Sequence, residues 1–335
     1  MKQLKIELII DYLEIQNQNI VIRLTSDTPS VVVCNTHGYE TDFFAFMQQI
    51  ISKLQQQGCI RTAEAYTSAL HSLRQFHQRD SLPFKLFDGD MALAYERSLR
   101  KRGVTPNTSS FYMRILRAVY NRAVKSGLIA DAHPFSHVYT SVGKTEKRAI
   151  DLDIIRKLAG LECMRKNERL ARDLFLFSFY TRGMSFVDMA YLKKDDLKAD
   201  TLHYTRSKTG QRLTIKWEPM MQEILNRNPT GANSPYLLPI IVNMQKNERS
   251  QYRYKQCVVN RELKKIGQTL NIGNHLTMYV ARHSWATIAK SIDIPLEVIS
   301  QAMGHTSERM THIYLKSIEN RYIDHANRKI LELLR

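Results

Sequence analysis

Long apolar runs are missing from this chain of 335 residues. The longest, such as DLFLFSFY and SPYLLPIIV, fall well short of the roughly 20 residues that a membrane-crossing helix needs. The first residues include an early acid and no small-residue cleavage site, which is not the pattern of a secretion signal. We therefore expect no membrane partner and a cytoplasmic location.

Cysteine is also scarce, and its spacing excludes the usual cysteine sites. Four cysteines are scattered along the chain without a CxxC pair or a histidine at metal-ligand spacing: Cys34, Cys59, Cys163 and Cys257. We predict reduced thiols and no zinc site. A phosphate-cradling glycine loop and a carboxylate cluster for two metal ions are also lacking, so the sequence predicts no metal and no cofactor.

Acidic residues are outnumbered by basic ones. The chain has 49 Lys and Arg residues against 32 Asp and Glu residues, for a net charge of +17. Such a surplus favours a polyanionic partner, with nucleic acid first and an anionic membrane surface second. The length and the 43% hydrophobic content are sufficient for two domains, each with its own core.

Periodicity divides the chain into four parts. Residues 1–36 carry β-branched runs broken by polar residues and proline, which predicts a β-rich appendage. Residues 41–133 have helical periodicity, residues 134–150 read as a linker, and residues 151–335 return to helices around one β-hairpin, in TLHYTRSKTGQRLTIKW. The predicted fold class is mainly α with a small β-hairpin or sheet.

The last helix of the 41–133 part carries a cluster of cations. It is predicted to start at Thr105-Pro106 and to end at Gly127. Its apolar positions alternate with four basic residues: Arg114, Arg117, Arg122 and Lys125. A single one of these is typical of a solvated face, but the cluster together with the net charge indicates contact with DNA.

The C-terminal third contains side chains suited to a phosphodiester. Arg282, His305 and Tyr314 fall on three successive short predicted helices. An arginine grips phosphate through two N–H groups, a histidine holds a non-bridging oxygen, and a tyrosine hydroxyl can attack phosphorus. Lys208, at the turn of the hairpin, offers an ammonium that could protonate a leaving oxygen, although a turn lysine is more often a plain solvated charge.

Four segments resemble the motifs of tyrosine recombinases, the phage-type integrase family. GHTSERMTHIYLK is similar to the closing motif, in which a Gly-His pair precedes the nucleophilic tyrosine by nine residues, as His305 precedes Tyr314. YVARHSWAT resembles the His-x-x-Arg-His box, SKTG the lysine turn of the hairpin, and GMSFVDMAYLKKDDL the first arginine box. The resemblance covers roughly residues 41–325 in order.

The resemblance implies both a fold and a mechanism. It implies a SAM-like helical core-binding domain followed by a mixed α/β catalytic domain, with residues 1–36 as an arm-site DNA module. Tyr314 would attack a DNA phosphate to form a 3′-phosphotyrosine, Lys208 would be the general acid, and Arg282 and His305 would hold the phosphorus charge, without a metal. It also implies a homo-tetramer on double-stranded DNA with inverted-repeat core sites.

Two positions depart from the family pattern. Ser185 stands where the first box has its arginine, and Tyr279 stands where the second box has its first histidine. Tyr279 can still donate a hydrogen bond to a phosphate oxygen. Arg182 lies three residues before Ser185, and we predict that it replaces the missing arginine. The alternative is an Arg182 that caps the preceding helix or pairs with Asp188.

Two classes of function remain. The first is a site-specific recombinase of a mobile element, which integrates, excises or inverts DNA. The second is a catalytically inactive DNA-binding protein that keeps the fold and regulates recombination sites. The presence of Tyr314, Arg282, His305 and Lys208 favours the first.

Overall fold

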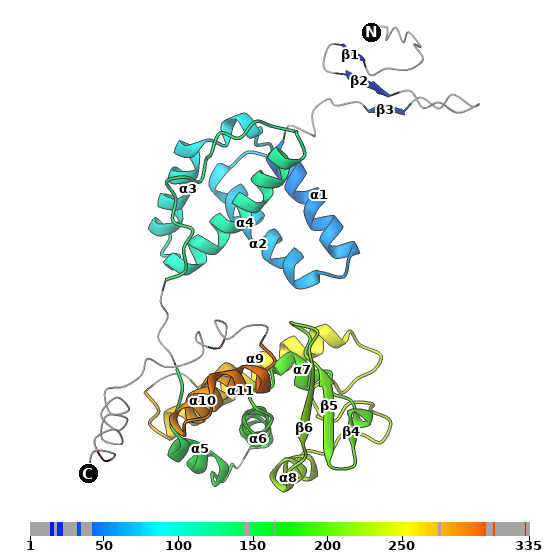
Figure 1. Cartoon of the computed structure of the whole chain (residues 1–335), viewed down its shortest axis with the longest axis vertical. Helices are drawn as coiled ribbons and strands as arrows, with labels where there is room; N and C mark the ends of the chain where they lie inside the picture. Colours follow the sequence, from blue (N-terminus) through cyan, green and yellow to red (C-terminus); the bar gives the residue numbers. More distant parts are fainter. Residues whose placement is uncertain are drawn as a thin grey trace, which may run out of the picture. The chain divides into compact units, whose positions relative to one another are not determined.

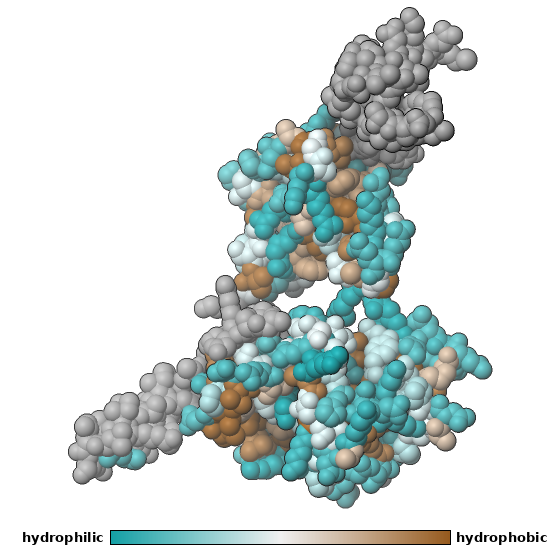
Figure 2. Space-filling model, turned by 45° about the vertical axis from the view of Figure 1, so that its right-hand side comes forward, coloured by the Kyte–Doolittle hydropathy of each residue, from teal (hydrophilic) through white to brown (hydrophobic). Residues whose placement is uncertain are grey.

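The chain divides into two compact units, Met1–Lys144 and Thr145–Arg335 (Figure 1). The computed structural model describes residues 14–16, 19–22, 32–34, 42–143, 148–163, 165–273, 276–305, 311 and 332. Hydrophilic side chains cover much of the described surface of each unit (Figure 2).

Three short strands are described before the first helix. They are β1 (Glu14–Gln16), β2 (Asn19–Ile22) and β3 (Val32–Cys34), and they form an antiparallel sheet in that order. Val21 is the register partner of both Glu14 and Val33. β2 and β3 lie within β-branched runs of the sequence, whereas β1 lies outside them.

Four helices build the rest of the first unit. Asp42, Asp88 and Thr105 cap three of them with a side-chain oxygen, and Pro106 opens α4, as its sequence predicts. Gly103 and Gly127 follow α3 and α4 with positive φ, the conformation that stops a helix. The elements are α1 (Phe43–Gln56), α2 (Ile60–His77), the 3₁₀ turn η1 (Phe84–Leu86), α3 (Gly89–Lys101) and α4 (Pro106–Lys125).

Aromatic packing closes the core of this unit. The rings of Phe43 and Phe87 stack at 4.6 Å, and Phe84 meets Phe43 edge-on at 5.3 Å. Asp42 joins the start of α1 to the loop before η1, because its carboxylate accepts hydrogen bonds from Ala45 N and Leu82 N. The helices therefore share one apolar core.

The second unit surrounds a central helix, α6. This helix packs against α5, α8, α9 and α10, and almost its whole middle is buried. The helices are α5 (Leu152–Ala159), α6 (Lys166–Tyr180), α7 (Phe186–Ala190), α8 (Pro219–Arg227), α9 (Glu248–Thr269), α10 (Met278–Ser291) and α11 (Leu296–Ala302), with the 3₁₀ turn η2 (Lys194–Asp196).

An antiparallel sheet stands at one edge of these helices (Figure 1). Its strands are β4 (Leu197–Lys198), β5 (Thr201–Thr205) and β6 (Arg212–Lys216). Leu202 pairs with Ile215 and Tyr204 with Leu213, which confirms the predicted hairpin. The fold is thus mainly helical with a small sheet, as predicted from the sequence.

Candidate active site

Arg282 is the centre of the candidate site. It lies on the first turns of α10, only 4% exposed, with its guanidinium between two other segments. Nη1 donates to the carbonyl of Gly183 at 2.6 Å, and Nη2 donates to the carbonyl of Met303 at 2.6 Å. The side chain thereby joins the loop after α6 to the turn after α11.

Gly183 is the residue that lets Arg282 come so close. A Cβ at position 183 would lie 2.7 Å from Cγ and 2.8 Å from Cα of Arg282. The φ of Gly183 is also +76°, which L side chains rarely adopt. The glycine of the first box is therefore required by the arginine of the second.

His305 follows that turn and contacts Arg282 directly. Its Nε2 lies 2.9 Å from Arg282 Nη2, and its Nδ1 lies 2.8 Å from the hydroxyl of Thr311. A guanidinium nitrogen can only donate, so Nε2 accepts and the proton sits on Nδ1. Burial, and then the charges of Arg282, Arg206 and Lys208, lower the pKa of His305 to about 4. The imidazole is neutral at physiological pH.

This pKa predicts a pH dependence of stability. The unfolded chain binds a proton at His305 near the ordinary pKa of 6.5, whereas the folded chain binds it near 4. The free energy of unfolding should therefore fall as the pH falls from about 6.5 to about 4, by about 3 kcal/mol from this group. Denaturant titrations at several pH values should show a smaller fall for His305→Asn. Equal falls in both proteins would contradict the assignment.

Lys208 lies exposed on the turn between β5 and β6. A buried carboxylate holds the turn, because Oδ1 of Asp188 accepts from the backbone N of Ser207 at 2.9 Å and from its hydroxyl at 2.6 Å. The next residue, Thr209, donates its hydroxyl to the carbonyl of Gly304 at 3.4 Å, so the turn lies beside the residue before His305. The structure therefore brings Lys208, Arg282 and His305 to one region, from three separate elements.

Ser185 donates a hydrogen bond to the same carboxylate of Asp188. It is the N-cap of α7, and its hydroxyl donates to Oδ2 of Asp188 at 2.7 Å. Asp188 thus has two serine partners, Ser185 and Ser207. A short polar network occupies the position where the family has a guanidinium.

Arg182 does not continue helix α6 toward Ser185. The helix ends at Tyr180, and Arg182 itself adopts a left-handed φ of 61°. Its Nη1 donates to the carbonyl of Thr214 on β6 at 3.3 Å. A shared helical face with Ser185 therefore does not exist, and the catalytic role of Arg182 stays a prediction.

The two candidate tyrosines are placed differently. Tyr279 is 55% exposed on the first turn of α10, with its ring edge-on to His283 at 4.5 Å. Tyr314 lies outside the described residues. Thr311, three positions before it, is fully buried against His305.

Arg206 is a site residue that the motifs do not mark. It is 5% exposed, and its Nη1 donates to the carbonyl of Gly304, the residue before His305. The signal in the sequence is alternation, because Arg206 falls on the same side of β5 as Leu202 and Tyr204.

Over the described ranges, no group of three or more His, Cys, Asp or Glu side chains is arranged to hold a metal ion. In the same ranges, no helix has the length and apolar character for crossing a bilayer.

The predicted DNA-binding cations of α4 are all exposed, on one side of the helix. Three have partners within the unit: Nε of Arg114 donates to the carbonyl of Ser110 at 3.4 Å, Arg117 donates to the hydroxyl of Thr140 at 3.2 Å, and the guanidinium of Arg122 lies 5.9 Å from the ring centre of Tyr66. These contacts leave the charges at the surface, so the face is suited to phosphate contacts.

Neutralising this face should weaken DNA binding and its salt dependence. A variant with glutamine at Arg114, Arg117, Arg122 and Lys125 should release fewer counterions when it binds DNA. The negative slope of the logarithm of the binding constant against the logarithm of the salt concentration should therefore become shallower by about 3. Fluorescence anisotropy with duplex DNA at several salt concentrations measures this slope. Arg156→Gln, an exposed arginine of the other unit, is the control. An unchanged slope in the fourfold variant would remove α4 from the DNA interface.

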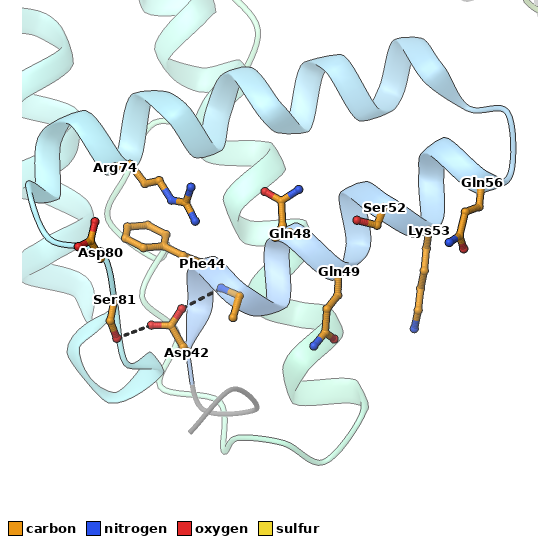
Figure 3. Close-up of a pocket in the computed structure, with 11 residues that line it drawn as sticks. Asp42, Phe44, Gln48, Gln49, Ser52, Lys53, Gln56, Arg74, Asp80 and Ser81 are labelled. Atoms are coloured by element: carbon orange, nitrogen blue, oxygen red, sulfur yellow. Dashed lines mark hydrogen bonds between the residues drawn. The ribbon is translucent and has the colours of Figure 1, made fainter. Parts of the chain in front are cut away.

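A hollow of about 810 Å³ also lies on the first unit (Figure 3). One side is the polar face of α1, and the other includes Arg74, whose guanidinium lies 5.2 Å from the Phe44 ring centre. Asp42 accepts from the hydroxyl of Ser81 at its rim. Its lining residues all belong to the first unit.

Comparison with known families covers most of the chain. Residues 42–138 match the Phage integrase SAM-like domain, and residues 161–321 match the Phage integrase family. The tyrosine recombinase XerA of Pyrococcus furiosus is 25% identical over 230 residues, which are 67% of this chain and 75% of that protein.

Solved structures share the fold. A lambda integrase dimer bound to a COC′ core site has a TM-score of 0.60 at 14% identity, covering 93% of this chain and 96% of that one. The Tn1549 transposon integrase in complex with a circular intermediate DNA has a TM-score of 0.64 at 15% identity, covering 86% and 99%. A lambda integrase tetramer bound to a Holliday junction has a TM-score of 0.61 at 15% identity, covering 83% and 79%.

Proposed function

Because this chain belongs to the phage integrase family of tyrosine recombinases, it is a site-specific DNA recombinase, and we propose that Tyr314 is its nucleophile. The phenolic oxygen of Tyr314 loses its proton to solvent and forms a bond to the scissile phosphorus, the bond from phosphorus to the 5′ oxygen breaks, and solvent later restores the proton that Lys208 gives up. Lys208 gives a proton to the departing 5′ oxygen. The product is a 3′-phosphotyrosine and a free 5′-hydroxyl.

The buried Arg282–His305 pair is the observation that supports this chemistry best. The guanidinium is already fixed by Gly183 and Met303, so it needs little reorganisation when negative charge develops on the phosphate oxygens. His305 is held neutral with its Nδ1 proton directed at Thr311. An entering phosphate favours the protonated imidazole and raises its pKa, which strengthens a hydrogen bond to the oxygen.

The covalent intermediate preserves the energy of the cut bond. A phosphodiester to Tyr314 replaces a phosphodiester to a deoxyribose, so a 5′-hydroxyl from another strand can reverse the reaction without ATP. Exchange of strands between two sites follows from this reversibility. Integration, excision and inversion use the same chemical step and differ in the arrangement of the sites.

We propose double-stranded DNA with inverted-repeat core sites as the substrate and a homo-tetramer as the active assembly, in the cytoplasm. The basic face of α4 and the net charge of +17 support DNA binding. The tetramer is proposed by analogy with the lambda integrase tetramer on a Holliday junction. We propose residues 1–36 as an arm-site DNA module, residues 41–133 as the core-binding domain, residues 134–150 as a linker and residues 151–335 as the catalytic domain.

The proposal is tested by cleavage of a nicked duplex. Sites recovered from random duplexes by repeated binding are synthesised with a nick beside the cut, so that the small 5′-hydroxyl fragment diffuses away and the covalent complex accumulates. Wild-type protein should become linked to DNA in a complex that survives denaturing electrophoresis. Tight sequence-specific binding without such a complex would instead establish the inactive DNA-binding protein, which the comparisons do not favour.

A further inference from the structure

Position 185 leaves the active site one guanidinium short of the family pattern. The hydroxyl of Ser185 donates to Asp188 at 2.7 Å, and the same carboxylate accepts from Ser207 in the hairpin turn, so Ser185 helps to position that turn. A hydroxyl also carries no charge with which to stabilise a phosphorane. The charge that the first box supplies elsewhere in the family has to come from another residue if this site is active.

Arg206 is placed to supply it. The residue directly follows β5, on the inward side of the strand, and its Nη1 donates to the carbonyl of Gly304. A Cβ at Gly304 would lie 3.1 Å from Cδ of Arg206 and 2.9 Å from Cδ1 of Leu213. The segment that carries His305 is therefore fitted closely against the Arg206 side chain.

Arg206 and Arg282 make matching contacts. Arg282 donates to the carbonyl of Met303 and Arg206 donates to the carbonyl of Gly304, the next residue. Each arginine also packs against a glycine with positive φ, Gly183 for Arg282 and Gly304 for Arg206. Two guanidinium groups from different elements thus hold the backbone that leads into His305.

Arg206 is a buried cation for which the described part of the chain provides no carboxylate at ion-pair distance. Arg172 shows the contrast, since it is equally buried but lies 2.7 Å from the carboxylate of Asp173. The carboxylate of Asp188 accepts hydrogen bonds from Ser185 and Ser207, and it is not within ion-pair distance of Arg206. A buried charge without a counterion is unfavourable, and a bound anion removes that cost.

We propose that Arg206, rather than Arg182, is the second guanidinium that contacts the scissile phosphate. Arg182 is partly exposed, and its guanidinium donates a hydrogen bond to the backbone carbonyl of Thr214 on β6. Arg206 instead donates to the same backbone segment as Arg282, and it begins the turn that carries Lys208. The inference rests on the proposed function, because it assigns a residue to the same phosphate.

Single variants in the nicked-duplex assay separate the two arginines. Arg206→Ala should lower the cleavage rate by about 10² or more, because it removes a donor to the charge of the transition state. Arg206→Lys should recover part of the rate, because it restores the charge without the planar fork. Arg182→Ala tests the competing assignment, and Arg212→Ala, an exposed arginine of the same hairpin, is the control for loss of a positive charge.

A neutral substrate distinguishes a charge role from a structural one. A methylphosphonate at the cut position has no negative non-bridging oxygen, so its cleavage depends less on a cation. Arg206→Ala should cleave this substrate at a rate within about tenfold of wild type. A misfolded variant would be slow on both substrates, and Arg206→Gln, which keeps the aliphatic stem and an uncharged N–H donor, then repeats the comparison.

Three results would overturn the inference. They are cleavage by Arg206→Ala within about threefold of wild type, an equal defect of folded Arg206→Ala and Arg206→Gln on both substrates, and a loss of about 10² in Arg182→Ala alone.

Failure of the proposed function looks different, because wild-type protein would then form no covalent complex. In that case NMR of the His305 imidazole during titration with inorganic phosphate decides whether Arg206 still holds an anion. A response lost in Arg206→Ala would support the anion site, and an unchanged response would exclude it.

Discussion

Replacing Tyr314 by phenylalanine should abolish the covalent protein–DNA complex while leaving DNA affinity unchanged. The substitution removes only the hydroxyl that attacks phosphorus, and nothing else in the proposed mechanism can form the phosphotyrosine. We expect the rate of covalent complex formation to fall by at least about 10⁴-fold. Denaturing electrophoresis of the nicked duplex measures the complex, and a gel shift measures the affinity.

Tyr322→Phe is the matched control, since this tyrosine follows eight positions later and lies outside the closing motif. It should leave the rate within a few-fold of wild type. A covalent complex that persists in Tyr314→Phe would show that another side chain is the nucleophile.

Arg282→Ala should have the second largest effect, on both activity and stability. The guanidinium contacts two buried backbone carbonyls and His305, so its loss leaves the carbonyls of Gly183 and Met303 without these donors. We expect a loss of about 3 kcal/mol in the free energy of unfolding and a fall of about 10³-fold in the cleavage rate. Denaturant unfolding and the nicked-duplex assay measure the two effects.

Arg282→Lys separates charge from geometry at this position. An ammonium keeps the charge, but it cannot donate from two separate nitrogens to Gly183 and Met303. We expect a rate between those of wild type and Arg282→Ala. Cleavage by Arg282→Ala at the wild-type rate would mean that the pair with His305 is structural.

Local patterns of the sequence predicted much of the fold. The hairpin pairs Leu202 with Ile215, as the alternation of apolar residues indicates, because each strand has one buried face. Helix α4 begins at Pro106 behind a Thr105 cap because this combination satisfies the free N–H groups of a first turn. Such features depend on neighbours in the chain, so they can be read without the structure.

The Arg182 hypothesis depended on a backbone direction that the sequence does not specify. It assumed that Arg182 and Ser185 could share a helical face. Two successive residues with positive φ, Arg182 and Gly183, turn the chain instead. A non-glycine residue in this conformation is uncommon and has no reliable signature in the sequence.

For Arg206, the direction of the side chain is predictable from the sequence, but its contacts are not. Its inward direction could be read from the alternation along β5, but what it faces depends on the segment around Gly304, almost a hundred residues later in the chain. The same holds for Gly183, whose small size is explained only by the approach of Arg282. Contacts between distant segments decide which arginines lie beside His305, and motif spacing does not encode them.

The most direct test of this account is to identify the linkage formed by the wild-type protein. The covalent complex with a nicked duplex is digested with nuclease and trypsin, and the nucleotide-bearing peptide is sequenced by mass spectrometry. We predict a 3′-phosphonucleotide on the peptide of residues 310–316, which contains one tyrosine, Tyr314, and a free 5′-hydroxyl on the released strand. An adduct on another residue, a 5′ linkage, or specific DNA binding with no adduct would contradict it.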